Sequence, residues 1–401
     1  MTPAERRASQ SLAAIFALRM LGLFLVLPVF ALEARKYPGG DDPALIGLAM
    51  GIYGLTQAVM QVPLGLASDR LGRKRVIVAG LLVFAAGSLL AAFADTLHML
   101  LAGRALQGAG AVSAAVTALL ADLTRDEVRT KGMALVGMSI GLTFAISLMA
   151  APPLAGWLGL SGLFGLTALL ALLGIAALLR WTPSEPARHA DQPRGRLADV
   201  WAHPRLWRLD LGVFVLHTVQ MAMWVVVPGL LVQAGLPKAA HWHVYLPAVL
   251  GSFVLMGGLF ALERRGHLLA VWRAAIALLL LVQTALALLT PQAPGLWALG
   301  AVLFFFFVAF NILEASQPSL VSRLAPPEAR GAALGMYNTL QSLGLFAGGA
   351  LGGVVLKGWG APAVFGLTAL LALAWLVLGW AQPMPATPAP VPEPDRPPTR
   401  P

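Results

Sequence analysis

Long apolar runs alternate with short polar segments along almost the whole chain. Each run has about 20 residues with few charges, which is the length that an α-helix needs to cross the hydrocarbon core of a bilayer. We expect each of twelve such runs to form a membrane-spanning helix. The runs cover residues 11–31, 44–67, 76–94, 97–121, 132–155, 161–180, 209–231, 244–262, 268–289, 296–320, 332–356 and 362–380. The pattern therefore predicts an all-α membrane protein.

The longest polar interruption, residues 181–206, divides the runs six and six and is rich in Arg and Pro. We expect an N-terminal six-helix half at residues 1–180 and a C-terminal six-helix half at residues 207–381. The interruption is then a cytoplasmic linker between the halves. The last segment, residues 382–401, is rich in Pro and is expected to form a disordered cytoplasmic tail.

Three short patterns recur in both halves in the same order, 194 to 201 residues apart. A separation this constant indicates a duplicated unit, so we expect two pseudo-symmetric six-helix bundles. Parallel repeats of this kind place a substrate site between the halves, near the middle of the membrane, where alternating access reaches it. The pairs are Phe16–Arg19 with Phe214–His217, Asp69–Arg73 with Glu263–His267, and Glu127–Arg129 with Glu328–Arg330.

The composition narrows the function further. Hydrophobic residues make up 58% of the chain and charged residues 11%, against about 25% charged residues in soluble proteins. The sequence has no Cys, which excludes disulfides and thiolate metal sites. It has no P-loop, no H-E-x-x-H and no Ser nucleophile elbow. We therefore expect neither an enzyme nor a metal protein, and no cofactor beyond a proton gradient.

The basic residues predict the orientation. If the N-terminus lies inside, 22 of the 28 Lys and Arg residues fall in inner segments and 4 in outer ones, as the positive-inside rule demands. This distribution assigns the net charge of +10 to topology and not to nucleic-acid binding. The first apolar run is too long for a typical signal peptide. We expect a multi-pass membrane protein with both termini cytoplasmic and with lipid as a partner.

A compact polar block, Gly65–Arg75, separates the second and third runs and holds four cations and one carboxylate. We expect it to form a charged hairpin between two antiparallel helices. Its pattern Gly65-x-Ala-x-Asp69-Arg70-x-Gly72-Arg73-Lys resembles the signature loop of the major facilitator superfamily. The segment Arg104–Gly110 resembles the fourth-span motif of the same superfamily.

Within that superfamily the chain is similar to YajR-type proton-driven drug exporters, over nearly all of residues 5–380. Leu18–Gly22, Gly51–Gln57 and Phe310–Glu314 are the segments that carry this closer resemblance. It implies secondary active transport by alternating access, with proton-coupled antiport that exports small lipophilic or cationic compounds. It also implies a monomer in a bacterial inner membrane, with a small molecule and protons as its partners. Two features depart from the pattern. The antiporter motif Gly-Pro-x-x-Gly-Gly reads Ala151–Gly156, and we expect the Pro-rich tail in place of the C-terminal soluble domain of YajR-type proteins.

Four ionisable residues within the runs are candidates for proton coupling: Glu314, His217, Arg104 and Arg19. Ionisable residues inside the membrane are costly and usually mark a pathway for ions or substrates. Glu314 is the only carboxylate deep in a run, roughly 13 Å from the inner surface by the rise of a helix. The alternative interpretation is structural, with a permanently protonated Glu314 and with the other three as hydrogen-bonding anchors.

Polar and aromatic residues at helical spacing are candidates for the lining of a substrate cavity. A lining of this mixed character suits amphipathic ligands, whereas the alternative is hydrogen bonding between helices. The candidates are Tyr53, Gln57, Gln61, Gln107, Gln220, Trp224, Asn311, Tyr337, Asn338 and Gln341.

The polar block is also a candidate conformational latch. A carboxylate at Asp69 is favoured against the N-terminus of the eleventh helix near Gly331, because the helix dipole favours an anion there. The resemblance implies a charge relay of Asp69, Arg73 and Asp122 that holds one conformer. Gly65, Arg70 and Gly72 complete the block. The alternative is a solvated topology loop.

Two other functions stand beside proton-coupled antiport. One is a proton-coupled or facilitative transporter of a specific metabolite, for which Arg19 and Arg104 suggest an anion. The other is a receptor or scaffold that does not transport. The buried Arg104 and Glu314 argue against a scaffold, which has no need of charges inside the membrane.

Overall fold

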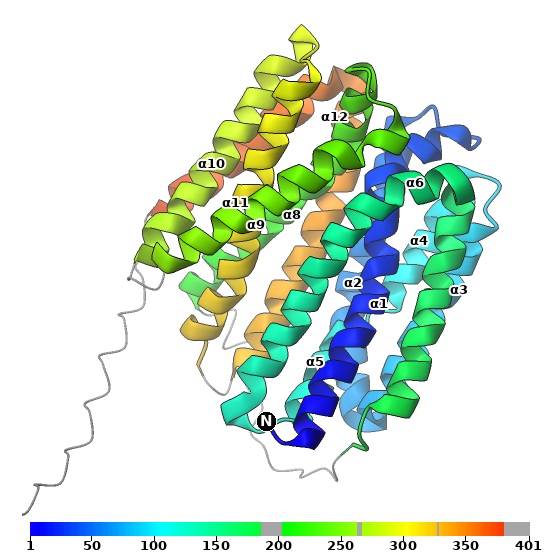
Figure 1. Ribbon diagram of the computed structural model, residues 1–401, viewed down its shortest axis with the longest axis vertical. Helices are drawn as coiled ribbons and strands as arrows, with labels where there is room; N and C mark the ends of the chain where they lie inside the picture. Colours follow the sequence, from blue (N-terminus) through cyan, green and yellow to red (C-terminus); the bar gives the residue numbers. More distant parts are fainter. Residues whose placement is uncertain (186–202, 263–266, 327–328, 381–401) are drawn as a thin grey trace, which may run out of the picture.

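The computed structural model describes residues 1–185, 203–262, 267–326 and 329–380, and this part of the chain is built of helices without strands (Figure 1). The long helices are α1 Pro3–Glu33, α2 Pro43–Leu71, α3 Arg73–Ala92, α4 Leu97–Ala109, α5 Ser113–Asp122, α6 Asp126–Trp181, α8 Pro204–Gln233, α9 Trp242–Leu262, α10 Leu268–Leu289, α11 Leu296–Leu324 and α12 Arg330–Trp380. Three short 3-10 helices, η1 Ala34–Lys36, η2 Lys238–Ala240 and η4 Thr290–Gln292, lie between them.

Ten helical segments of the described chain are long and apolar enough to cross a membrane. Two of them, α6 with 56 residues and α12 with 51, are far longer than a bilayer requires. Each contains one glycine with non-helical backbone angles, Gly159 (φ 64°) and Gly360 (φ 79°). Glycine adopts this region without the steric cost that a Cβ would bring. Each long element is therefore two helices joined at a glycine that falls between two predicted runs.

The fourth predicted span, residues 97–121, is confirmed as the candidate span Leu97–Asp122. Its helix is interrupted inside the span, because α4 ends at Ala109 and α5 starts at Ser113. The chain breaks where it passes close to α3: a Cβ on Gly110 would meet the carbonyl oxygen of Gly80 and the backbone of Phe84.

The polar block joins α2 to α3 and is itself mostly helical. Residues 65–71 form the last turns of α2, and α3 starts at Arg73. Gly72 alone makes the turn, with φ 107°, a value that favours glycine.

Helices α1–α6 form one side of the bundle and α8–α12 the other (Figure 1). We call the end that holds residues 34–42 and 234–241 the outer end, and the end that holds residues 70–73 the inner end, after the orientation that the basic residues predict. Helix α12 packs against both α8 and α2, and α1 packs against α6.

Helix α8 is the most buried of the candidate spans, because 89% of its apolar spanning stretch lies inside the protein. Its glycine-lined contact with α12 explains this. Cβ atoms added to Gly344 and Gly348 would meet the backbone carbonyls of Phe214 and Thr218. Small residues at four-residue spacing let two helix backbones approach in this way. The close packing places His217 and Gln220 beside α12.

Three parts of the sequence-based predictions lie outside the described residues. They are most of the linker (residues 186–202), most of the second copy of the polar block together with Glu328, and the tail from residue 381 onward.

Candidate functional site

A cavity of about 780 Å³ lies between the two halves. Its wall includes residues of α1, α2, α4, α6, α8, α9, α11 and α12, so both halves contribute. Ten of the residues proposed for proton coupling or substrate contact line it. These are Tyr53, Gln57, Arg104, His217, Gln220, Asn311, Glu314, Tyr337, Asn338 and Gln341.

Three predicted cavity residues, Gln61, Gln107 and Trp224, do not line this cavity. Positions four residues apart rotate by about 40° around a helix, so Gln61 lies off the face that presents Tyr53 and Gln57. It is 2% exposed. Gln107 is fully buried between helices, and its amide donates to the Ser88 hydroxyl (2.7 Å).

Trp224 lies one turn of α8 nearer the outer end than Gln220. Its ring packs edge-on against Tyr245 of α9, with centroids 5.5 Å apart, and the side chain is 3% exposed. The prediction failed here because spacing along the helix does not show where the cavity ends.

On the wall formed by the C-terminal half, one amide joins the two titratable side chains. Nε2 of Gln341 donates to Oε1 of Glu314 (3.2 Å) and lies 2.8 Å from Nε2 of His217. Nδ1 of His217 lies 3.0 Å from the carbonyl oxygen of Val213. A carbonyl only accepts, so Nδ1 carries a hydrogen and the neutral ring presents a lone pair at Nε2. The two hydrogens of the Gln341 amide therefore satisfy one imidazole nitrogen and one carboxylate oxygen.

A second contact in this cluster requires a proton. Oε2 of Glu314 lies 3.4 Å from Nε2 of His217, is buried and has no hydrogen-bond partner among the described residues. Two lone pairs repel each other, so this contact becomes favourable only when one proton lies between them. The cluster therefore has two possible arrangements. Without the proton, the Gln341 amide bridges His217 and Glu314; with the proton, Glu314 and His217 also bind each other directly.

On the opposite wall, Arg104 of α4 is 3% exposed. Its Nη1 donates to the side-chain oxygen of Gln107 (2.9 Å) and its Nη2 to the carbonyl of Met50 (3.4 Å). Its guanidinium carbon lies 4.9 Å from the centre of the Tyr53 ring. This is a cation–π distance. All of these partners are neutral.

Arg19 of α1 lies behind the cavity wall and is 1% exposed. Nη2 donates to the Tyr53 hydroxyl (2.7 Å) and to Oε1 of Gln57 (3.4 Å), and Nη1 donates to Ser113 (3.2 Å). Arg19 thus fixes two side chains that line the cavity.

The polar block forms the predicted charge relay within its own half. Arg73 Nη1 lies 2.6 Å from Oδ1 of Asp69, and its Nε lies 3.1 Å from Oδ2 of Asp122. The side-chain carboxylate of Glu185, at the start of the linker, accepts from the backbone N–H groups of Arg73 (3.1 Å) and Lys74 (2.6 Å).

The other members of the block have simpler surroundings. The Arg70 side chain is exposed at the end of α2. Gly65 faces Ala114 of α5, and Gly72 makes the turn. At the start of α12, no atom approaches the Cβ position of Gly331 within 4 Å, so that position is open.

The outer end is sealed between the halves. Cβ atoms on Gly47 and Gly51 of α2 would overlap the backbone of α12 at Gly349 and Phe346. Two ion pairs cross the same seam, Glu33 with Lys238 and Asp42 with Lys357 (2.8 Å).

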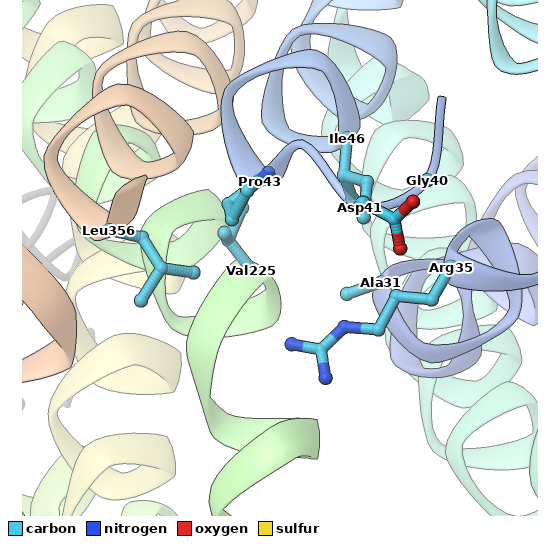
Figure 2. A pocket seen from close by; sticks show the side chains of 8 residues that line it. All are labelled: Ala31, Arg35, Gly40, Asp41, Pro43, Ile46, Val225 and Leu356. Carbon is cyan, nitrogen blue, oxygen red and sulfur yellow. The ribbon is translucent and has the colours of Figure 1, made fainter. Parts of the chain in front are cut away.

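A small pocket of about 320 Å³ lies at this outer end. In Figure 2 the Arg35 side chain extends past Ala31 into the space that faces Val225 and Leu356, and Pro43 lines the same pocket. The central cavity lies further in, on the inner side of the seam.

The sequence did not predict the two ion pairs at the outer end, Glu33 with Lys238 and Asp42 with Lys357. The sequence of a loop does not show which residue of the other half it will contact. The sequence-based predictions also missed Asp210, a carboxylate of α8 that is 4% exposed and whose Oδ1 has no partner among the described residues. The signal was available, since Asp210 precedes His217 by seven residues and shares its helical face.

The comparisons with known proteins agree with this geometry. The family model described as Major Facilitator Superfamily matches residues 12–349 of the chain, with a second match over residues 318–401. The chain is 43% identical over 383 residues to the inner membrane transport protein YajR of Escherichia coli (strain K12), covering 94% of this chain and 84% of that protein. It is 29% identical over 357 residues to the multidrug resistance protein MdtH of Aeromonas salmonicida (strain A449), covering 87% and 86% of the two chains.

Solved structures share the fold. A bacterial homologue of the human lysosomal transporter Spinster superposes with a TM-score of 0.74 at 15% sequence identity, covering 95% of this chain and 97% of that one. These findings define a helical membrane transporter. The chain belongs to the Major Facilitator Superfamily, so the predicted resemblance is confirmed.

Proposed function

We propose that this transporter is a proton-coupled antiporter that exports small lipophilic compounds, cationic ones among them, by alternating access. The observation that carries this proposal is the His217–Gln341–Glu314 cluster, which offers one proton a site in the wall of the central cavity. The relative MdtH, named a multidrug resistance protein, supports export of foreign compounds.

The architecture proposed is twelve spans in two pseudo-symmetric halves. The ten long segments become twelve if α6 and α12 each turn at their non-helical glycine. We place the transporter in a bacterial inner membrane with both termini cytoplasmic, in line with the basic residues and with the name of the relative YajR.

In this orientation the sealed outer end makes the structure an inward-open state. The Asp69–Arg73–Asp122 relay is then the part that meets α12 when the inner end closes. Opening outward would break the seam at Gly47 and Gly51.

Proton and substrate compete for Glu314 in this mechanism. When Glu314 is ionised, Gln341 holds it in place and a cationic group of a substrate gains a carboxylate partner in the cavity wall. When a proton lies between Glu314 and His217, that partner is lost and the substrate is released. A ligand shifts such an equilibrium by its differential affinity for the two states.

The test is proton flux in proteoliposomes that contain the full chain and an internal pH dye. With an imposed pH gradient, adding a transported lipophilic cation should move protons in the opposite direction to the compound. Proton flux in the same direction as the substrate, or substrate flux without dependence on the gradient, would contradict antiport.

A further inference from the structure

The wall formed by the N-terminal half holds two buried cations without counter-ions. Arg19 and Arg104 are 1% and 3% exposed, and neither forms an ion pair with a described residue. The Nε atom of each is buried without a hydrogen-bond partner. Arginine stays protonated in proteins. A buried charge that is solvated only by neutral groups is costly unless an anion compensates it.

The opposite wall compensates only half of this charge. Glu314 is the only carboxylate among the residues that line the cavity, and it is already bound by Gln341 on the far side. The cavity therefore has one fixed cation in one wall, Arg104, with a second, Arg19, directly behind it, and one carboxylate in the other wall.

Tyr53 presents the positive wall to the cavity. Its hydroxyl accepts from Arg19 (2.7 Å), its ring lies against the Arg104 guanidinium (4.9 Å), and both Tyr53 and Arg104 line the cavity. Since the hydroxyl oxygen accepts from a cation, its own hydrogen is polarised and available to donate. Tyr53 and Arg104 are 2% and 3% exposed, so both lie within the cavity wall. A carboxylate or another organic anion that reaches this part of the wall would meet the hydroxyl hydrogen of Tyr53 and the guanidinium of Arg104.

Between the two charged walls the lining is apolar and adaptable. Methionine and aromatic side chains predominate there, and a cavity of about 780 Å³ accommodates a drug-sized molecule. The apolar lining includes Met20, Phe24, Phe144, Met221, Phe253 and Met256.

We propose that the preferred substrates are zwitterionic amphipaths. Their cationic group binds Glu314, their anionic group binds Tyr53 and Arg104, and their apolar body lies between. This inference rests on the proposed antiport, because competition with the proton takes place at the cationic group.

Neither a purely cationic compound nor a purely anionic compound matches the charges of both walls. A purely cationic compound competes with the proton at Glu314 but leaves both guanidinium groups uncompensated. A purely anionic compound gains the guanidinium groups, yet a proton at Glu314 would add positive charge and strengthen its binding, which gives cotransport in one direction. The zwitterion satisfies the fixed cations and still exchanges with a proton.

The test compares acids with their esters, which differ in the anionic group alone. Rhodamine B and ciprofloxacin are zwitterions, whereas their ethyl or methyl esters keep only the cation. Equilibrium binding to the purified full chain in detergent should be at least about tenfold tighter for each acid, the effect of one hydrogen bond to a charged group. The proposal is overturned if neither acid binds more tightly than its ester, including the case in which none of the four binds.

Two substitutions test whether the preference for acids over esters depends on Arg104 and Tyr53. Arg104→Gln should reduce the acid-to-ester ratio to within about twofold, and Tyr53→Phe, which keeps the ring beside Arg104, should reduce it by about threefold or more. The control is Arg35→Gln, an exposed arginine at the outer pocket, which should leave the ratio unchanged. If Arg104→Gln does not fold, Tyr53→Phe decides, and an unchanged ratio in it contradicts the subsite.

Binding needs no gradient, so the two proposals fail separately. An Arg104-dependent preference for acids without any proton flux would leave the subsite standing and refute antiport. Proton antiport that is equally fast for acids and esters would leave antiport standing and refute the zwitterion assignment.

Discussion

The two walls of the cavity carry equivalent positions of the repeat but opposite electrical behaviour. Arg19 in α1 and His217 in α8 occur in the first of the matching patterns, 198 residues apart. Arg19 is a fixed cation that donates to three neutral side chains. His217 is linked to Glu314 through the amide of Gln341.

This difference between the two walls suggests how the two halves of a duplicated transporter take different parts in transport. A wall whose charge never changes sets which ligands are tolerated, since Arg does not lose its proton at any accessible pH. A wall with a carboxylate and an imidazole has side chains that can gain or lose a proton, which is what coupling to a proton gradient requires. Under the proposed mechanism, coupling is assigned to the C-terminal half and selectivity to the N-terminal half.

Among the substitutions that test this division between the two walls, one at Glu314 is expected to have the largest effect on transport. Glu314→Gln keeps the shape but fixes the site as neutral, as if permanently protonated. Gradient-driven transport should fall by about 100-fold, at the lower end of what positioned proton-transfer groups contribute, and its dependence on pH should disappear. Initial rates of substrate efflux from proteoliposomes at several pH values measure both quantities.

The matched control for that variant is Glu127→Gln, because Glu127 is an exposed glutamate at the start of α6. Its transport rate and pH dependence should equal those of the unaltered protein. A Glu314→Gln variant that keeps the pH dependence of the unaltered protein would show that the exchangeable proton is held elsewhere, with Asp210 as the next residue to replace.

A smaller effect is expected at His217. In His217→Gln the side chain still hydrogen-bonds but no longer shares a proton with Glu314, so the protonated arrangement loses one charge-assisted hydrogen bond. Driven transport should fall by about tenfold while remaining sensitive to pH. A loss as complete as in Glu314→Gln would place the proton on the imidazole instead.

Most of the fold was predictable from the sequence, because a spanning helix needs only a run of apolar residues of fixed length. The sequence also indicated the Asp69–Arg73–Asp122 relay and ten residues of the cavity wall. Contacts between helices were not predictable. Gln107 forms a hydrogen bond with Ser88 because Gly87 lets α3 approach α4, and that approach depends on three-dimensional packing.

On the fixed wall, Arg19→Lys keeps the charge and tests the planar donor group. A lysine ammonium cannot reproduce the fork that holds Ser113, Tyr53 and Gln57 together. Affinity for a zwitterionic substrate should fall by about fivefold, since Tyr53 loses its fixed position, while the pH dependence of transport stays unchanged. Fluorescence titration and pH-dependent efflux measure the two effects, and a changed pH dependence would mean that the walls do not act separately.

The smallest effect is expected at the outer seam, where Asp42 and Lys357 pair between the halves (2.8 Å). Asp42→Asn should raise the outward-open fraction by at most about fivefold, because exposed ion pairs contribute little. Spin-label distances across the outer end measure that fraction, and Asp95→Asn, an exposed outer carboxylate, is the control.

The same pair makes a prediction about pH. Its hydrogen bond from Lys357 lowers the pKa of Asp42 below its ordinary value. A lowered pKa means that the pair is fully formed above the ordinary value and is lost only as the pH falls through the lowered one. The pair should therefore keep the outer seam insensitive to pH between about 5 and 8. If the outward-open fraction of a Glu314→Gln protein still changes across that range, the seam itself responds to protons and the division between the two walls is incomplete.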